Sequence, residues 1–133
     1  MESVYAVGVG GANIDLCGRS YAAIAPRDSN PGEIEISAGG VTRNICDNLA
    51  RLGADVKLVS AVGDDLFGEL ICRESAAAGI DLSHVYRAEG RKSSMYLAIL
   101  DESGDMHVAL SDMHVLQTMP LEYLEREKAL IAN

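Results

Sequence analysis

The sequence predicts an α/β protein with a parallel sheet and a separate small β layer. Short runs rich in Val, Ile, Leu and Ala alternate with amphipathic helical segments, which is the order of a parallel α/β core. Glycine is frequent, with 13 in 133 residues, and suits the tight turns between such elements. Residues 14–38 and 95–110 do not follow the strand–helix alternation, so we expect them to form a β layer of their own.

The first elements that we expect are a buried strand at residues 4–9 and a helix that begins after Gly39 and Gly40. The strand segment is a short apolar run rich in β-branched residues. Between the two, residues 33–36 alternate Glu and Ile, which is typical of a strand with one face in water. The helix has one apolar stripe and a stop signal at Gly53. The stripe consists of Val41, Ile45, Leu49 and Leu52.

The middle of the chain predicts a second strand–helix unit. Residues 55–62 form an apolar run that we expect to be a buried strand. Asp64 and Asp65 follow it and are suited to cap the N-terminus of a helix, which Gly79 ends. A short third strand is expected around residues 82–85.

The last part of the chain predicts a β-hairpin and a final helix. Residues 95–100 and 106–110 are apolar runs on either side of a polar loop that contains Gly104. Pro120 is placed as in the first turn of a helix, and the helical pattern continues from there to residue 131 without a stop signal.

Composition and charge exclude several classes of function. The net charge is −9, and Lys and Arg do not cluster, so a nucleic-acid surface is not expected. No apolar run approaches the roughly 20 residues that cross a bilayer, and the N-terminus does not resemble a signal peptide. We therefore expect a cytoplasmic protein without a nucleic-acid or membrane partner.

The cysteines and histidines do not predict a metal or disulfide site. Three widely spaced cysteines form no C-x-x-C pair, so we expect reduced, partly buried thiols. Three histidines show neither metal-ligand nor triad spacing, and we interpret them as surface residues or residues of the β layer. These residues are Cys17, Cys46, Cys72, His84, His107 and His114.

The first candidate binding motif follows the first strand. Residues 8–13 begin like a dinucleotide-binding fingerprint, but Asn13 stands at the third glycine position and no helix pattern follows. Asn13 and Asp15 alternate, so both side chains would lie on one face at the carboxyl end of a strand, where open α/β sheets bind ligands. A carboxylate there can accept two hydroxyl hydrogen bonds, although a turn capped by Asn and Asp is an equal alternative.

The second candidate motif is the start of the helix after Gly39 and Gly40. Two glycines allow backbone N–H groups to approach a ligand closely, and the helix N-terminus favours electron-rich atoms. Asn44 lies in the first turn and would point toward the same opening. By itself this pattern is also compatible with a helix start whose Asn is solvated.

Taken together, the motifs resemble, in order and spacing, the N-terminal half of the ribokinase-like (PfkB) carbohydrate kinase family. The resemblance spans residues 4–131. The matching features are residues 13–15, Gly39-Gly40 with Asn44, Gly53, residues 60–65 and Gly68. Finer features are similar to the pseudouridine kinases of this family; they lie at residues 28–32, 40–53, 93–97 and 112–113.

The resemblance implies a ribokinase-like fold, a Rossmann-like αβα sandwich with a small β lid. Residues 1–133 would be the N-terminal part of the kinase domain, without the ATP-binding half. The lid segments would lie at about residues 13–20, 33–38 and 95–110. In the same way, the resemblance implies that Asp15 binds sugar hydroxyls and that Asn13 and Asn44 add hydrogen bonds. The glycine pair, Gly39 and Gly40, would let the ribose lie against the backbone.

The implied activity is transfer of phosphate from ATP, with Mg²⁺, to a ribosyl 5′-hydroxyl, most specifically that of pseudouridine. Family members carry a Gly-Ala-Gly-Asp motif whose Asp is the catalytic base, and this sequence contains no such motif. We therefore expect no catalytic or metal-binding residue in this chain, and neither catalysis nor strong ATP or Mg²⁺ binding by it alone. The resemblance also allows a homodimer formed through the lid.

Two alternatives to an incomplete kinase stay open at this stage. One is a stand-alone nucleoside- or sugar-binding or regulatory module; the final helix without a stop signal speaks against it. The other is a half-enzyme completed by a separate partner chain.

Overall fold

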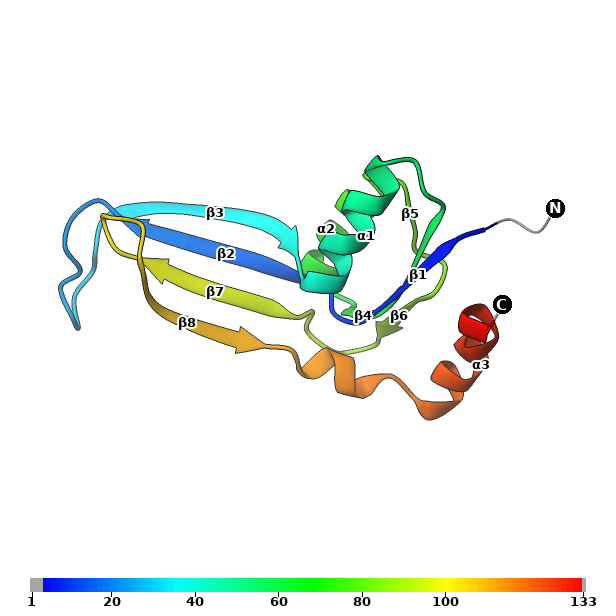
Figure 1. The fold of residues 1–133 in the computed structure, drawn as a ribbon. Coiled ribbons are helices and arrows are strands. Elements are labelled where there is room, and N and C mark those ends of the chain that lie inside the picture. Colours follow the sequence, from blue (N-terminus) through cyan, green and yellow to red (C-terminus); the bar gives the residue numbers. More distant parts are fainter. Residues whose placement is uncertain (1–3, 133) are drawn as a thin grey trace.

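A computed structural model describes residues 4–132, and its strands form two separate sheets (Figure 1). The first, here called the body sheet, is entirely parallel, as the sequence predicts. β4 lies at its centre, with β1 on one side and both β5 and β6 on the other. The strands are β1 (Ala6–Val9), β4 (Val56–Gly63), β5 (Ile80–Asp81) and β6 (Val85–Ala88).

The strand expected around residues 82–85 is instead divided into β5 and β6. β5 pairs with the beginning of β4, and β6 pairs with its end. Between them, Asp81 Oδ1 accepts hydrogen bonds from the backbone N–H of Ser83 at 2.9 Å and from its hydroxyl at 2.6 Å. This side-chain turn diverts the chain from an extended course, so a single continuous strand is wrong here.

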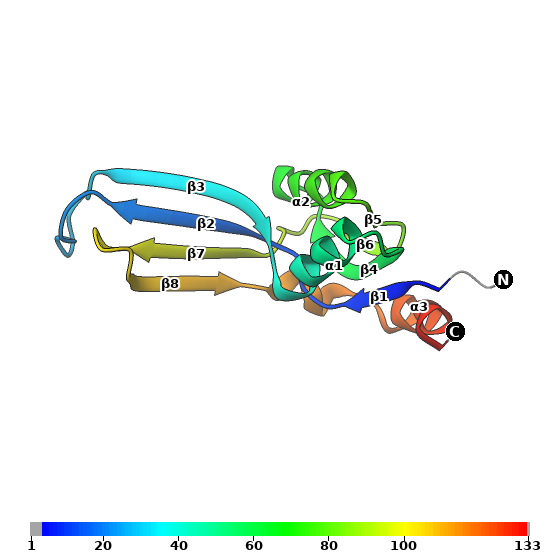
Figure 2. The same ribbon diagram turned by 45° about the horizontal axis from the view of Figure 1, so that its top comes forward.

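The second sheet, here called the outer sheet, extends away from the body (Figures 1 and 2). Its order is β3-β2-β7-β8, in which β2 and β7 are parallel and both outer pairs are antiparallel. The chain passes between body and outer sheet four times, before β2, after β3, before β7 and after β8. The strands are β2 (Asn13–Ser20), β3 (Gly32–Gly39), β7 (Met95–Leu100) and β8 (Met106–Asp112). The predicted separate β layer and its hairpin are thus confirmed.

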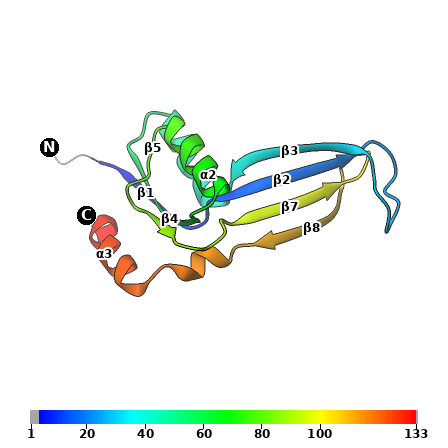
Figure 3. The same cartoon turned by 180° about the vertical axis from the view of Figure 1, so that it is seen from behind.

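Helices cover both faces of the body sheet. The helices α1 (Val41–Arg51) and α2 (Leu66–Ala77) lie on one face, and the 3₁₀ helix η1 (His114–Thr118) and α3 (Leu121–Ala132) lie on the other (Figures 1 and 3). The main core lies between the sheet and the first two helices, and a smaller cluster lies beneath η1. No helix within residues 4–132 is long and apolar enough to span a membrane.

Helix α1 forms where the sequence predicts it, but its apolar stripe is largely exposed. Its buried side chains are Arg43, Cys46 and Asp47. Arg43 Nη2 lies 2.8 Å from Asp47 Oδ2, one helical turn away, so the two buried charges compensate each other. The exposed members of the stripe are Val41 (79% exposed), Ile45 (54%) and Leu52 (84%).

The signals for helix ends are mostly confirmed. Gly53 and Gly79 follow α1 and α2 with φ angles of 91° and 97°, the left-handed conformation expected of such stops. Asp65 caps α2 by accepting a hydrogen bond from Gly68 N–H at 2.8 Å. Asp64 does not share this role, because its carboxylate accepts from the backbone N–H of Gly90. The expected double cap is therefore a single one.

The cysteines agree with the expectation of reduced, partly buried thiols. All three are free; Cys46 is buried, and Cys17 and Cys72 are half-buried. Burial raises the pKa of the Cys46 and Cys72 thiols above their ordinary value.

Candidate functional site

A hollow of about 500 Å³ lies where the outer sheet joins the body. The beginnings of β2, β7 and α1 and the region of η1 all contribute to its wall. Four of the five site residues predicted from the sequence line it. The principal polar and large lining residues are Asn13, Asp15, Gly40, Asn44, Tyr96 and Met113.

Asn13 and Asp15 lie on the same face of β2, as their alternation predicts. The Asn13 Nδ2 group donates a hydrogen bond to Asp15 Oδ1 over 2.6 Å. Asn13 is only 4% exposed, and this bond leaves its side-chain oxygen as an acceptor. The carboxylate and the amide oxygen therefore form a pair of acceptors beside the hollow.

The glycine pair makes room for these acceptors. A Cβ atom on Gly39 would overlap with the Asp15 carboxylate, although Gly39 itself does not line the hollow. Gly40 has φ of 98°, and a Cβ there would lie 2.7 Å from the Gly11 carbonyl oxygen and 2.8 Å from Asn13 Oδ1. Both positions thus require glycine for the internal packing of the site.

Asn44 reaches the hollow from the first turn of α1. The helix begins directly after Gly40, and Asn44 N–H donates to the Gly40 carbonyl over 2.8 Å. No side chain among the described residues caps this N-terminus, and its first turn contains no acidic residue. Arg43 N–H donates to the Gly11 carbonyl over 3.3 Å, and the positive end of the helix dipole favours an electron-rich ligand in the hollow.

Tyr96 is a lining residue that the sequence analysis did not select. The parallel register of β2 and β7 sets it opposite Asp15, so both side chains lie on the same face of the outer sheet. Met113 and Leu116 reach the hollow from the segment after β8. Local pattern shows which residues of a strand share a face, but it does not show which distant strand pairs with it.

The chain before β7 is held in place by Asp65. Its carboxylate accepts from Ser93 N–H at 2.9 Å and from the Ser93 hydroxyl at 2.6 Å, in addition to the helix cap. The same hydroxyl accepts from Gly63 N–H at 2.9 Å. Burial acts to raise the pKa of Asp65, but the hydrogen bonds from Ser93 and Gly68 outweigh it and the pKa is lowered. Asp65 is thus ionised, and both of its carboxylate oxygens accept hydrogen bonds from the protein itself.

His84 and His114 contact different carboxylates. His84 Nδ1 lies 2.6 Å from Glu127 Oε2, and His114 Nδ1 lies 2.8 Å from Asp112 Oδ1. In the part of the chain that the structure describes, His, Cys, Asp and Glu side chains form no group of three placed to hold a metal ion.

Comparison with known proteins identifies the family. Residues 4–132 match the model of the pfkB family of carbohydrate kinases. The chain belongs to this family. It is similar to the pseudouridine kinase of Escherichia coli strain K12, with 38% identity over 139 residues that cover 99% of the chain and 44% of the relative. It is equally similar to the uncharacterized sugar kinase YeiI of the same strain, with 39% identity over 99% of the chain and 36% of the relative.

The fold agrees with this membership of the pfkB family. The structure of a carbohydrate kinase from Agrobacterium tumefaciens superposes with a TM-score of 0.86 and 32% identity, over 97% of this chain and 43% of that one. The fold is therefore the N-terminal portion of a ribokinase-like kinase, as the sequence predicts. The chain spans less than half the length of these relatives.

Proposed function

We propose that this chain is the sugar-binding part of a pfkB kinase that phosphorylates the 5′-hydroxyl of pseudouridine. The observation that carries the proposal is the placement of Asp15, Asn13 and Asn44 around one hollow. An ionised carboxylate that accepts hydrogen bonds from two hydroxyls binds a diol more strongly than a neutral group does. Met113 and Leu116 line the same hollow and offer apolar contact to a flat base.

The choice of pseudouridine rests on the similarity to pseudouridine kinases at the finer motifs. The similarity to a sugar kinase is as high, so the diol-binding groups alone do not separate a nucleoside from a free sugar. Pseudouridine, uridine and ribose share the ribose hydroxyls and differ in the base. Titration of each into the protein separates these substrates, and our proposal expects the tightest binding for pseudouridine.

We propose ATP with Mg²⁺ as the phosphate donor of the complete kinase. Phosphoryl transfer depends on positioning and on electrostatic stabilisation of the transferred group. The sequence contains no Gly-Ala-Gly-Asp motif that would supply the base and the anion-binding amides. We therefore expect the 133-residue chain to bind the nucleoside without phosphorylating it; the outer sheet would cover the sugar as a lid.

Replacement of Asp15 by alanine tests the proposed site. A charge-assisted hydrogen bond contributes about 1.5–3 kcal/mol, so pseudouridine affinity should fall by roughly one to two orders of magnitude. Isothermal titration calorimetry measures the affinity, and a thermal melt checks that the variant folds. Glu125→Ala removes an exposed carboxylate on α3, which does not line the hollow, and as the matched control it should bind like the unaltered chain. Equal affinity of the Asp15→Ala variant would refute the assignment.

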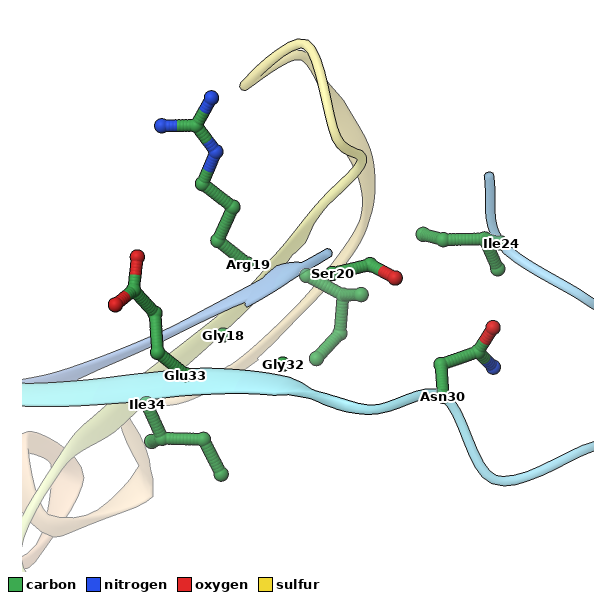
Figure 4. A pocket seen from close by; sticks show the side chains of 9 residues that line it. Gly18, Arg19, Ser20, Ile24, Asn30, Gly32, Glu33 and Ile34 are labelled. Atoms are coloured by element: carbon green, nitrogen blue, oxygen red, sulfur yellow. The ribbon is translucent and has the colours of Figure 1, made fainter. Parts of the chain in front are cut away.

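We further propose that the outer sheet forms a homodimer through its apolar face. The register sets Ile34 and Ile36 of β3 on the same face as Val108 and Leu110 of β8, and all four side chains are more than half exposed. Figure 4 shows Ile24 and Ile34 beside a second hollow of about 340 Å³ at the outer end of this sheet. Apolar faces of this kind mark interfaces between proteins.

Analytical ultracentrifugation tests the dimer. The unaltered chain should sediment as a dimer, and Ile36→Asp should sediment as a monomer because the charge would be buried in the interface. Leu121→Asp is the matched control, since Leu121 is 70% exposed but lies on α3, away from this face. A monomeric unaltered chain at tens of micromolar would contradict the proposal.

A further inference from the structure

Arg43 is a buried charge next to the candidate sugar site. Its side chain comes from α1 and is only 6% exposed. Three acceptors surround its guanidinium: Ser75 Oγ of α2 at 3.0 Å from Nε, Asp47 Oδ2 at 2.8 Å from Nη2, and Asn44 Oδ1 at 3.3 Å from Nη1. The group is thus fixed in direction by contacts on three sides.

The stability of the helix does not explain this arrangement by itself. A buried ion pair is often no more stabilising than well-packed apolar residues of similar size. In α1 the charged residues Arg43 and Asp47 lie inside, while the apolar side chains of Val41 and Ile45 are exposed. The buried guanidinium makes hydrogen bonds that an apolar side chain could not make, and one of them is to the Asn44 amide.

The contact fixes which end of the Asn44 amide faces Arg43. A guanidinium has five N–H donors and no acceptor. The side-chain oxygen of Asn44 therefore has to face Arg43, and its NH₂ group is left to donate elsewhere. Asn44 also lines the hollow, so the group that it offers to a ligand there is a hydrogen-bond donor.

The hollow then has acceptors on one side and a donor on the other. The Asp15 carboxylate and the Asn13 oxygen are acceptors on β2, because Asn13 uses its own NH₂ group to bind Asp15. The donor on Asn44 comes from α1. A sugar hydroxyl between them can donate to Asp15 and accept from Asn44, which uses both hydrogen-bonding capacities of the hydroxyl.

We propose that Arg43 is a positioning residue for sugar binding, which orients the Asn44 amide so that its NH₂ group faces a ligand hydroxyl. The inference rests on the proposed function of the hollow. It assigns a role in recognition to a residue that does not line the hollow itself. Loss of Arg43 would let the amide rotate, and the Asn44 oxygen would then meet the acceptors of β2.

A double-mutant cycle on the full 133-residue chain tests this role. Arg43→Lys keeps a positive charge near Asp47. It lacks the branched guanidinium group that also donates to Asn44 and Ser75. Its pseudouridine affinity should fall about 5- to 10-fold, and that of Asn44→Ala about 10-fold. Because Arg43 acts through Asn44, the double variant should bind no more weakly than Asn44→Ala alone.

The control is Arg51→Lys, the same substitution in the same helix. Arg51 also contacts Asp47, but its side chain is 65% exposed. This variant should keep the affinity of the unaltered chain. If the two losses multiply in the double variant, or if Arg43→Lys binds normally, the positioning role is refuted. If the unaltered chain binds neither pseudouridine nor ribose, the proposed function itself fails instead.

A measurement on the unaltered chain covers the case in which Arg43→Lys does not fold. The side-chain NH₂ signals of Asn44 in a ¹H–¹⁵N spectrum can be assigned by comparison with the Asn44→Ala variant. These signals should shift when pseudouridine is added, because the NH₂ group contacts the ligand. Binding that leaves them unshifted would overturn the inference.

Discussion

Replacement of Asp65 by alanine removes three hydrogen bonds with one substitution. Loss of the cap on Gly68 N–H costs about 1 kcal/mol, within a usual range of about 0.5–2 kcal/mol. The backbone N–H of Ser93, a residue that is 1% exposed, also loses its acceptor, at a cost of about 1–3 kcal/mol. The free energy of unfolding should therefore fall by about 2–4 kcal/mol.

Urea denaturation followed by circular dichroism measures this change. With the usual dependence on urea of about 1–3 kcal/mol per molar, the midpoint should move down by about 0.7–4 M. Asp64→Ala is the matched control, because the neighbouring carboxylate is exposed and accepts only from Gly90 N–H among the contacts described above. Its cost should be below about 1 kcal/mol.

The isosteric variant Asp65→Asn separates the contribution of the helix cap from that of the hydrogen bond to Ser93. Its amide oxygen can still cap α2, but its NH₂ group would meet the N–H of Ser93, so an intermediate loss is expected. If Asp65→Ala is no less stable than Asp64→Ala, the proposed clamp between α2 and the chain before β7 is wrong.

Further predictions concern the site, the charges and the thiols. Gly39→Ala should lower pseudouridine affinity at least as much as loss of the Asp15 carboxylate, since its Cβ displaces that group; unchanged calorimetric affinity would contradict the packing argument. The hydrogen bond from Arg51 lowers the pKa of Asp47 below its unfolded value of about 3.9, so its stabilising contribution is present above that pH and is lost as the pH falls further. Melting temperatures between pH 6 and 2.5 should decrease below about pH 4, and Asp47→Asn should flatten this decrease. Cys46 should resist alkylation in the folded chain and react only in urea, as peptide mass analysis after labelling can show.

Much of the fold could be predicted because its signals are local. Glycines after helices, the cap residue Asp65 and the strand β3 each depend on neighbours within a few residues. The expected buried face of β3 is wrong, because Ile34 and Ile36 are 74% and 52% exposed. The same holds for Asn13 and Asp15, whose spacing alone sets them on one face. The glycine pair and Asn44 were found for the same reason.

Features that depend on distant contacts could not be predicted. Tyr96 lines the hollow because β7 pairs with β2. Most of the body lies between these two strands in the sequence. The buried face of α1 was missed because periodicity ranks Arg43 and Asp47 as solvent-facing residues. The hydrogen bond to Ser75 of α2 and the mutual ion pair compensate for the burial of these two charges.

The chain passes four times between the body and the outer sheet, and the hollow at this junction depends on how the two sheets are oriented. Asp15 belongs to the outer sheet, whereas Asn44 belongs to a helix of the body, and both line the hollow at this junction. Any rotation of one sheet against the other changes the separation of these two side chains. A ligand held by both would therefore fix the angle between the sheets, and the width of the hollow would follow that angle.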